Sequence, residues 1–186
     1  MIGIIPARKN SERLPNKNMM QINGKSLLEH TIDISLESNY IDMIVVTTDC
    51  DIDDLVDKYK IQPVMFRRRQ ESLCGDNVST QDVVDDVMER FVGDCYILLQ
   101  PTSPLRSTSD INKCIEMYQG TGCDSLISVV EHEPHQYKNN GAVYIFNKKI
   151  FGSYRVLYVM SKEKSVDIDT LDDFRLAEKM LNNDRK

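Results

Sequence analysis

Short apolar runs alternate along the chain with segments whose apolar residues recur at the spacing of a helix face. The apolar runs predict buried strands at 2–5, 41–46, 63–66, 95–99, 124–130, 139–146 and 154–160. The intervening segments predict helices at 26–36, 51–59 and 80–91, a fourth that begins near residue 109 and a fifth that begins after residue 170. Strands that alternate with helices form a mostly parallel, doubly wound sheet. We therefore expect an α/β fold with helices on both faces of the sheet.

Polar residues mark where these helices begin. Ser26 is followed three residues later by Glu29, which is the spacing of a capping box, and Ser79 precedes the third helix. Ser109 is the expected cap of the fourth helix. Thr170 is the expected cap of the last helix, whose first turn is acidic.

The composition predicts one soluble domain that comprises residues 1–186, since 41% hydrophobic and 28% charged residues are ordinary values. No apolar stretch approaches the length of about 18 residues that spans a bilayer, so we expect no membrane partner. Because Met1 leads directly into the first strand, we expect no signal peptide and a cytoplasmic location. The five cysteines lack a CxxC spacing, which argues against a disulfide framework and a zinc site.

Charge is distributed unevenly along the chain. The net charge of −6 and the absence of tryptophan argue against a nucleic-acid partner. Residues 8–18, however, carry four basic residues against Glu12, a local charge of +3. They follow the first predicted strand, and ligands of open α/β sheets bind beyond the carboxyl ends of the strands. This loop therefore suggests a polyanionic small ligand such as a triphosphate, with an ordinary solvated loop as the alternative.

The sequence of this loop, ARKNSERLPNKN, is more specific than its charge. It resembles the opening motif of the acylneuraminate cytidylyltransferases, the family that makes CMP-sialic acid and related CMP-sugars. The resemblance implies a Rossmann-like nucleotidyltransferase fold in which this loop wraps the phosphates of CTP. The matching positions, from which we take the basic and polar residues as CTP-binding, are Arg8, Ser11, Arg13, Leu14, Pro15, Lys17 and Asn18.

Two later segments resemble nucleotide-binding motifs of the same family. RRRQESLCGDNVST matches at Arg69, Leu73, Asp76 and Ser79, where the family's arginine and serine approach the cytidine. LLQPTSPLR, which follows a predicted strand, contains Gln100 and Thr102. A glutamine there offers a donor and acceptors to a pyrimidine edge, whereas a plain turn would explain only the prolines. The resemblance thus adds four CTP-binding residues: Arg69, Ser79, Gln100 and Thr102.

Residues 165–170 (SVDIDT) predict an extended stretch, in which alternate side chains point the same way. Asp167 and Asp169 would then present two carboxylates on one face, which suits Mg²⁺. A plain helix entry is the alternative, but Asp172 and Asp173 already supply acids to the first helical turn. The stretch also resembles the family's closing motif, whose paired aspartates hold the metal. We expect Asp167 and Asp169 to be the metal ligands.

The chain departs from the family between the strands at 124–130 and 139–146. Family members carry there a long arm that pairs two subunits and supplies residues to the sugar site. Here only a short loop remains, and its histidines lack the spacing of a metal site. We therefore expect no arm-exchanged dimer and a smaller or more open acceptor pocket. Lys138, Arg155 or a partner protein would then be candidates to supply positive charge to an acidic acceptor.

The resemblance implies a CTP-dependent cytidylyltransferase that activates a small acidic sugar of the sialic, legionaminic or pseudaminic type. The acceptor oxygen would attack the α-phosphorus of CTP and displace pyrophosphate, while Arg8, Lys17 and Mg²⁺ neutralise the phosphates. A metal-bound water or Asp167 would take the proton. Three alternatives are a cytidylyltransferase for a smaller acceptor such as a phosphonate, a GT-A-type glycosyltransferase and a non-catalytic nucleotide-binding module.

Overall fold

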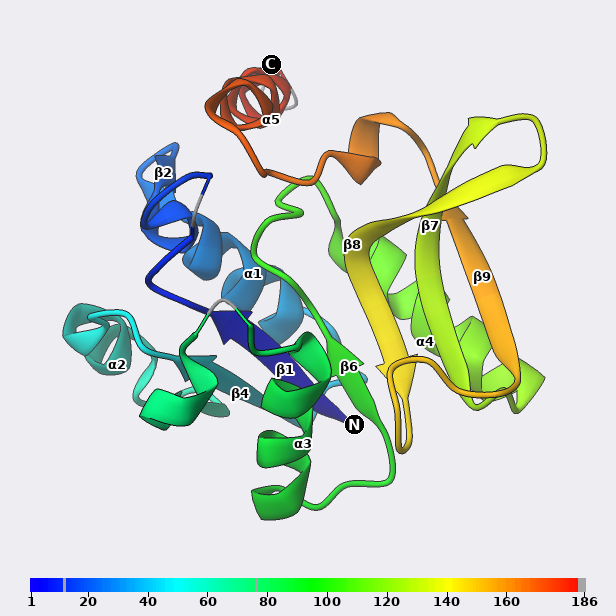
Figure 1. Ribbon diagram of the computed structural model, residues 1–186, viewed down its shortest axis with the longest axis horizontal. Helices are drawn as coiled ribbons and strands as arrows, with labels where there is room; N and C mark the ends of the chain where they lie inside the picture. The colour runs from blue at the N-terminus through cyan, green and yellow to red at the C-terminus, as the bar shows by residue number, and fades with distance from the viewer. Residues whose placement is uncertain (12, 76, 184–186) are drawn as a thin grey trace.

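The computed structural model describes residues 1–11, 13–75 and 77–183, and its centre is a seven-stranded sheet (Figure 1). The strand order is β5-β4-β1-β6-β8-β7-β9. Every neighbouring pair is parallel except the two that involve β8. The strands are β1 (Ile2–Ala7), β4 (Met43–Thr48), β5 (Val64–Arg68), β6 (Tyr96–Leu98), β7 (Ser125–Glu133), β8 (Gln136–Phe146) and β9 (Arg155–Met160). The expected mostly parallel sheet is confirmed.

Helices cover both faces of this sheet, as expected. Residues of α1, α2 and α4 share one core cluster with the strands, whereas α3 packs into a second cluster on the opposite face (Figure 1). A third cluster holds α5 against α1 near the β2–β3 hairpin. The helices are α1 (Leu27–Leu36), α2 (Asp53–Tyr59), α3 (Thr80–Arg90), α4 (Thr108–Thr121) and α5 (Leu171–Asn183). Short 3₁₀ turns are η1 (Lys17–Met19), η2 (Glu71–Leu73) and η3 (Glu163–Ser165), and the hairpin pairs β2 (Gln21–Ile22) with β3 (Lys25–Ser26).

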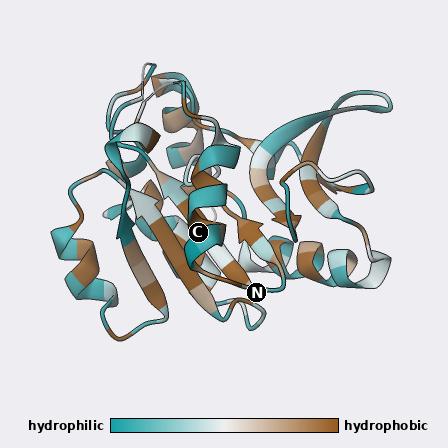
Figure 2. Cartoon of the chain, turned by 60° about the horizontal axis from the view of Figure 1, so that its bottom comes forward, coloured by the Kyte–Doolittle hydropathy of each residue, from teal (hydrophilic) through white to brown (hydrophobic). Residues whose placement is uncertain are grey.

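The hydrophobic residues lie where the alternating pattern predicts them. Figure 2 shows apolar colour concentrated on the strands and hydrophilic colour on the outer end of the β7–β8 hairpin. Ile4, Ile5 and Val45 are fully buried because β1 and β4 are covered on both faces. Among the described residues, no helix is both long and apolar enough to cross a bilayer.

Three of the four predicted helix caps are confirmed, namely Ser26, Ser79 and Thr170, whose Oγ1 accepts from the N–H of Asp173, and one is not. The reciprocal hydrogen bonds of a capping box are present at Ser26 and at Ser79. The fourth helix, however, is capped by Ser107, and the predicted cap Ser109 lies inside it. The prediction was wrong because Asp110 stands three residues after Ser107 and completes a capping box there, which starts the helix two residues earlier.

The predicted loop at 131–135 is largely strand. Backbone pairing continues through Glu131 with Tyr137 and Glu133 with Gln136, so the turn between β7 and β8 is only Pro134 and His135. The result is a hairpin that projects from the sheet (Figure 1). The prediction missed it because the outer residues of the hairpin are polar and exposed, so they lack the apolar run that marks a buried strand.

Candidate active site

A cavity of about 280 Å³ opens where β1, β4 and β6 end at the same edge of the sheet. Such an edge is where open α/β sheets bind ligands. Segments far apart in sequence meet there, and most of the predicted site residues line the cavity. These are Arg8, Lys17, Asn18, Arg69, Ser79, Gln100, Thr102, Asp167 and Asp169.

The loop after β1 is held by its own side chains and by β4. Asn18 donates from Nδ2 to the carbonyl oxygen of Arg8 at 2.9 Å. The backbone N–H of Lys9 donates to Oδ1 of Asp49, which follows β4, at 2.7 Å. Asn18 and Ser11 are buried. Asn18 therefore acts at least partly as a scaffold for the loop, and Asp49 is a support that the sequence analysis did not single out.

Lys17 joins this loop to the closing segment of the chain. Its Nζ donates to Oδ1 of Asp169 at 3.0 Å and to the carbonyl oxygen of Ile168 at 2.8 Å, and its side chain is only 12% exposed. Arg13, which does not line the cavity, places Nη1 2.9 Å from the other oxygen of Asp169. Each carboxylate oxygen of Asp169 therefore contacts a cationic side chain of the loop that follows β1.

The segment that carries Asp167 and Asp169 is not part of the sheet, but its side chains alternate as expected. Residues 166–169 have no regular secondary structure, and the N–H of Ile168 donates to the carbonyl oxygen of Thr102 at 2.8 Å. Ile168 is fully buried beside Phe174, and the two aspartates on either side of it line the cavity. A single buried isoleucine thus produces the pairing that alternation had predicted.

The helix that follows is capped by other residues. Asp173 accepts hydrogen bonds from the N–H groups of Asp169 and Thr170 and from the hydroxyl of Thr170, whose Oγ1 accepts from the N–H of Asp173. Among the described residues, Asp172 pairs only with Arg175, at the surface. Asp167 and Asp169 are therefore not needed as caps, as the sequence indicated.

The two carboxylates influence each other and their surroundings. Burial raises the pKa of Asp167, and the negative charge of Asp169 acts in the same direction, against a hydrogen bond from Thr102 and the charge of Lys17. Burial raises the pKa of Tyr144 to about 12, and the nearby negative charge of Asp167 acts in the same direction. A cation bound between the two aspartates and a ligand would reduce the electrostatic repulsion between the carboxylates of Asp167 and Asp169.

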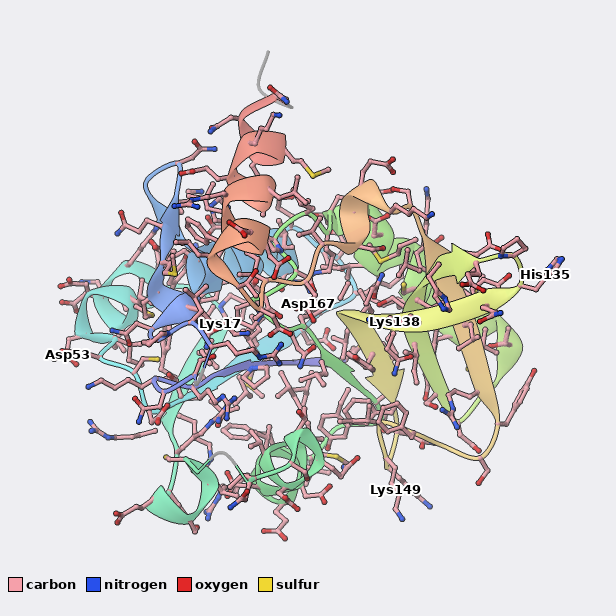
Figure 3. The ribbon with its side chains drawn as sticks, turned by 45° about the horizontal axis from the view of Figure 1, so that its top comes forward. Lys17, Asp53, His135, Lys138, Lys149 and Asp167 are labelled. Atoms are coloured by element: carbon pink, nitrogen blue, oxygen red, sulfur yellow. The ribbon has the colours of Figure 1, made fainter. Side chains whose placement is uncertain are left out.

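The donor set fits magnesium shared with a ligand. Mg²⁺ binds through one or two carboxylates and takes its remaining ligands from water and phosphate oxygens. Asp167 and Asp169 provide such a pair, and no group of three or more metal-binding side chains occurs in the described part of the chain. His135 lies at the tip of the hairpin, away from Lys17 and Asp167 (Figure 3).

Arg69 and Ser79 border the cavity from the β5 side. Arg69 donates from Nε to the carbonyl oxygen of Thr47 at 3.2 Å, and burial lowers its pKa while the nearby charge of Asp49 opposes that shift. The hydroxyl of Ser79 donates to Asp82 at 2.7 Å, so it caps α3 while it borders the cavity. Asp76, the remaining polar match of this segment, lies outside the described residues.

Gly141 forms a narrow part of the site, and the sequence analysis placed it only within the predicted strand at 139–146. Its φ is +74°, and a Cβ atom there would lie 2.9 Å from Oε1 of Gln100 and 3.3 Å from Oδ2 of Asp167. The glycine therefore allows Gln100 and Asp167 to approach the same stretch of β8. The sequence indicates this close approach only by a glycine inside a predicted buried strand, because glycine weakens a strand and often marks a point where another group comes near the backbone.

Replacing Gly141 with alanine should lower activity at least tenfold, because the new methyl group displaces Gln100 or Asp167. We expect the free energy of unfolding to fall by about 1–3 kcal/mol from the left-handed backbone strain. Gly120→Ala is the matched control, since Gly120 lies in α4 with open space around it and should keep full activity. Thermal unfolding and steady-state kinetics measure both effects, and an active Gly141→Ala enzyme would contradict the close approach.

One predicted acceptor residue is misplaced. Arg155 begins β9, which runs parallel to β7 and, through β8, parallel to β6, so it lies at the opposite edge of the sheet from the cavity. The proposal for Arg155 was wrong because the sequence does not reveal at which end of a strand the cavity lies. Lys138, on β8, remains as the other candidate.

Comparisons with known proteins agree with this geometry. The family model described as cytidylyltransferase matches residues 2–180. The chain is 32% identical to the N-acylneuraminate cytidylyltransferase of Streptococcus agalactiae serotype V over 214 aligned residues, which cover 93% of this chain and 51% of that protein. It is 31% identical to the CMP-N,N'-diacetyllegionaminic acid synthase of Legionella pneumophila over 224 residues, which cover 97% of this chain and 96% of that protein. The chain thus spans about half the length of the streptococcal relative and nearly all of the Legionella protein.

A solved structure supports the fold independently. The CMP:2-keto-3-deoxy-manno-octonic acid synthetase complexed with CTP superposes with a TM-score of 0.78, at 14% identity and 98% coverage of both chains. Both sequence alignments are longer than the 186 residues of this chain, so the relatives contain inserted residues that it lacks. The match over residues 2–180 and the identity above 30% lead to one conclusion: this chain belongs to the cytidylyltransferase family.

Proposed function

We propose that this chain transfers CMP from CTP to the anomeric hydroxyl of an acidic nonulosonate sugar and releases pyrophosphate. The observation that carries the proposal is the meeting of Arg8, Lys17, Asp167 and Asp169 in one cavity of a cytidylyltransferase-family chain. The named relatives act on sialic, legionaminic and pseudaminic acids, so an acceptor of this class is the best supported.

The protein residues act by positioning and by charge neutralisation. Arg8 and Lys17 border the cavity at the end of β1, where they would hold the triphosphate of CTP. Gln100, Arg69 and Ser79 also border the cavity and would contact the nucleoside, and the amide of Gln100 offers both a donor and an acceptor to a pyrimidine edge. An acceptor oxygen held in line with the α-phosphorus can displace pyrophosphate directly, so the reaction needs no covalent enzyme intermediate. Mg²⁺, held by Asp167 and Asp169, would neutralise charge on the phosphates.

A pyrophosphate-release assay tests this function. The chain is mixed with Mg²⁺, with CTP, UTP, ATP or GTP, and with sialic, legionaminic or pseudaminic acid, a phosphonate, or no acceptor. We expect the fastest release with CTP and a nonulosonate, and at least tenfold slower release with UTP, because uracil reverses the donor and acceptor of the cytosine edge and leaves polar groups around the base unpaired. CTP binding without release would instead indicate a nucleotide-binding module. Consumption of a sugar nucleotide would indicate a glycosyltransferase, and release with the phosphonate alone would indicate a smaller acceptor.

We also propose that the chain does not form an arm-exchanged dimer. The β7–β8 hairpin projects from the sheet, but its connection is only Pro134 and His135, and an interface of about 800 Å² per partner needs a larger surface than such a tip provides. Light scattering should therefore report the same mass for the wild type and for a variant with a shortened hairpin. A dimer that is lost on shortening the hairpin would contradict this.

A further inference from the structure

Both oxygens of Asp169 already have a positive partner within the chain. Nη1 of Arg13 lies 2.9 Å from Oδ2, and Nζ of Lys17 lies 3.0 Å from Oδ1. Asp169 also borders the cavity beside Asp167, as one of the two proposed ligands of Mg²⁺. A divalent ion bound about 2 Å from a carboxylate oxygen would stand close to both cationic side chains and repel them. Metal binding at Asp169 is therefore favoured when at least one of these cations has another anion to contact.

The two cations are held with different strength. The side chain of Lys17 is only 12% exposed, and it also donates to the carbonyl oxygen of Ile168 at 2.8 Å. The side chain of Arg13 is 68% exposed, and its pair with Asp169 is the only ion pair that it forms with a described residue. Exposed ion pairs contribute little to stability, so Arg13 can leave Asp169 at small cost. Lys17, by contrast, keeps its contact with Ile168 even without Asp169.

A triphosphate is the ligand that would draw Arg13 away. Arg13 belongs to the same loop as Arg8 and Lys17, which border the cavity, and its guanidinium contacts Asp169 on the cavity wall. Phosphate groups held by Arg8 and Lys17 would therefore lie within reach of the long side chain of Arg13. The planar guanidinium can bind phosphate oxygens through two parallel hydrogen bonds, and a triphosphate carries more negative charge than one carboxylate. Asp169 is thus an anionic partner of Arg13 that phosphate can replace.

We propose that the Arg13–Asp169 ion pair is a releasable contact that couples nucleotide and metal binding. When the triphosphate binds, Arg13 leaves Asp169 for a phosphate oxygen, and the carboxylate of Asp169 becomes available to the metal ion. Coupling of this kind is reciprocal, so Arg13 also turns to the phosphates more readily when Asp169 holds a metal ion. The inference rests on the proposed function in one respect, namely that the cavity holds the triphosphate of CTP and a divalent metal ion.

Binding of Mn²⁺ in the absence of nucleotide tests the metal half of this exchange. Mn²⁺ takes the same oxygen ligands as Mg²⁺, and electron paramagnetic resonance measures how much of it is unbound. Arg13→Ala should bind Mn²⁺ about fivefold more tightly than the wild type, because the competing cation is gone. Arg175→Ala is the matched control: the side chain of Arg175 is 66% exposed and pairs with Asp172 at 3.3 Å, so the same charge is lost from an ion pair that does not involve Asp169. Its Mn²⁺ affinity should stay within about twofold of the wild-type value.

Titration calorimetry with CTP in the presence of a metal chelator tests the nucleotide half. Asp169→Asn should bind metal-free CTP about fivefold more tightly, since Arg13 is no longer held, whereas Asp172→Asn, which removes the same charge nearby, should keep the wild-type affinity. Arg13→Ala should bind metal-free CTP about tenfold more weakly, the size of one charge-assisted hydrogen bond. The loss caused by Arg13→Ala should be about fivefold larger in an Asp169→Asn background, because there Arg13 has no ion pair to break before it binds phosphate.

Two results would overturn the inference: an unchanged Mn²⁺ affinity of Arg13→Ala, or an equal loss of CTP affinity from Arg13→Ala in both backgrounds. Either result leaves the proposed function intact, because pyrophosphate release with CTP and a nonulosonate does not depend on how nucleotide and metal binding are coupled. A wild-type chain that binds neither Mn²⁺ nor CTP would overturn both.

Discussion

Replacing Asp169 with asparagine should reduce CTP-dependent pyrophosphate release by roughly 100- to 1,000-fold, the range seen when one charge-stabilising group is lost from an active site. Asp169 borders the cavity, and its two oxygens face Lys17 at 3.0 Å and Arg13 at 2.9 Å. The substitution removes the negative charge that suits Mg²⁺ and leaves both cations without their partner. The chain should remain folded, because Asp173 accepts the capping hydrogen bonds at the start of α5.

Asp172→Asn is the matched control for this experiment. Asp172 lies three residues further along the chain, its side chain is 90% exposed, and within the described part of the chain it pairs only with Arg175, at 3.3 Å. Its replacement should leave activity within about twofold, since exposed ion pairs contribute little. The Mg²⁺ concentration at half-maximal activity should rise for Asp169→Asn alone. Unchanged activity of Asp169→Asn at limiting Mg²⁺ would contradict the metal assignment.

Replacing Lys17 with alanine should weaken CTP binding by about 10- to 150-fold, because hydrogen bonds to charged groups contribute about 1.5–3 kcal/mol. Lys17 is well buried, borders the cavity and connects the loop after β1 to Ile168 and Asp169. Its loss therefore removes a phosphate-binding charge and loosens the loop that carries Arg8. We therefore expect a large loss of affinity for CTP and only a small loss of thermal stability.

Lys9→Ala is the control for the general positive charge of the loop. Lys9 belongs to the same loop, but its side chain is exposed and does not line the cavity, and its N–H bond to Asp49 survives the substitution. We expect a small, salt-dependent loss of CTP affinity for Lys9→Ala. Calorimetry that finds equal CTP affinity for Lys17→Ala and the wild type would show that this cavity does not hold the phosphates through Lys17.

The order of strands and helices could be predicted because each element is marked by a pattern within its own stretch of sequence. Buried parallel strands read as apolar runs, and the amphipathic helices between them read as stripes, so the order of elements followed directly. The errors arose at positions that the apolar pattern does not mark. Asp110 is held by Lys164 at 2.7 Å as well as by Ser107, and this contact supports a helix start two residues before the predicted one. The β7–β8 hairpin depends on backbone pairing, which leaves no side-chain pattern.

The sequence predicted which residues lie at the candidate site better than it predicted how they are arranged. The matched motifs brought Arg8, Lys17, Gln100 and the two aspartates to one cavity, as expected. Arg13 lies outside the cavity lining and contacts Asp169, and its binding of CTP stays a prediction. The supporting residues Asp49 and Gly141 were not assigned any role from sequence, because they acquire their meaning only from the groups that surround them in space.

The central claim is that an oxygen of the acceptor sugar attacks the α-phosphorus of CTP in this cavity. The most direct measurement uses a nonulosonate labelled with oxygen-18 at the anomeric hydroxyl, CTP and Mg²⁺, with the products followed by phosphorus NMR and mass spectrometry. We predict equal amounts of pyrophosphate and a CMP-sugar that retains the label in the bond to phosphorus, with no such product from Asp169→Asn. A CMP-sugar without the label, or CTP left unconverted by the wild-type chain, would contradict the account.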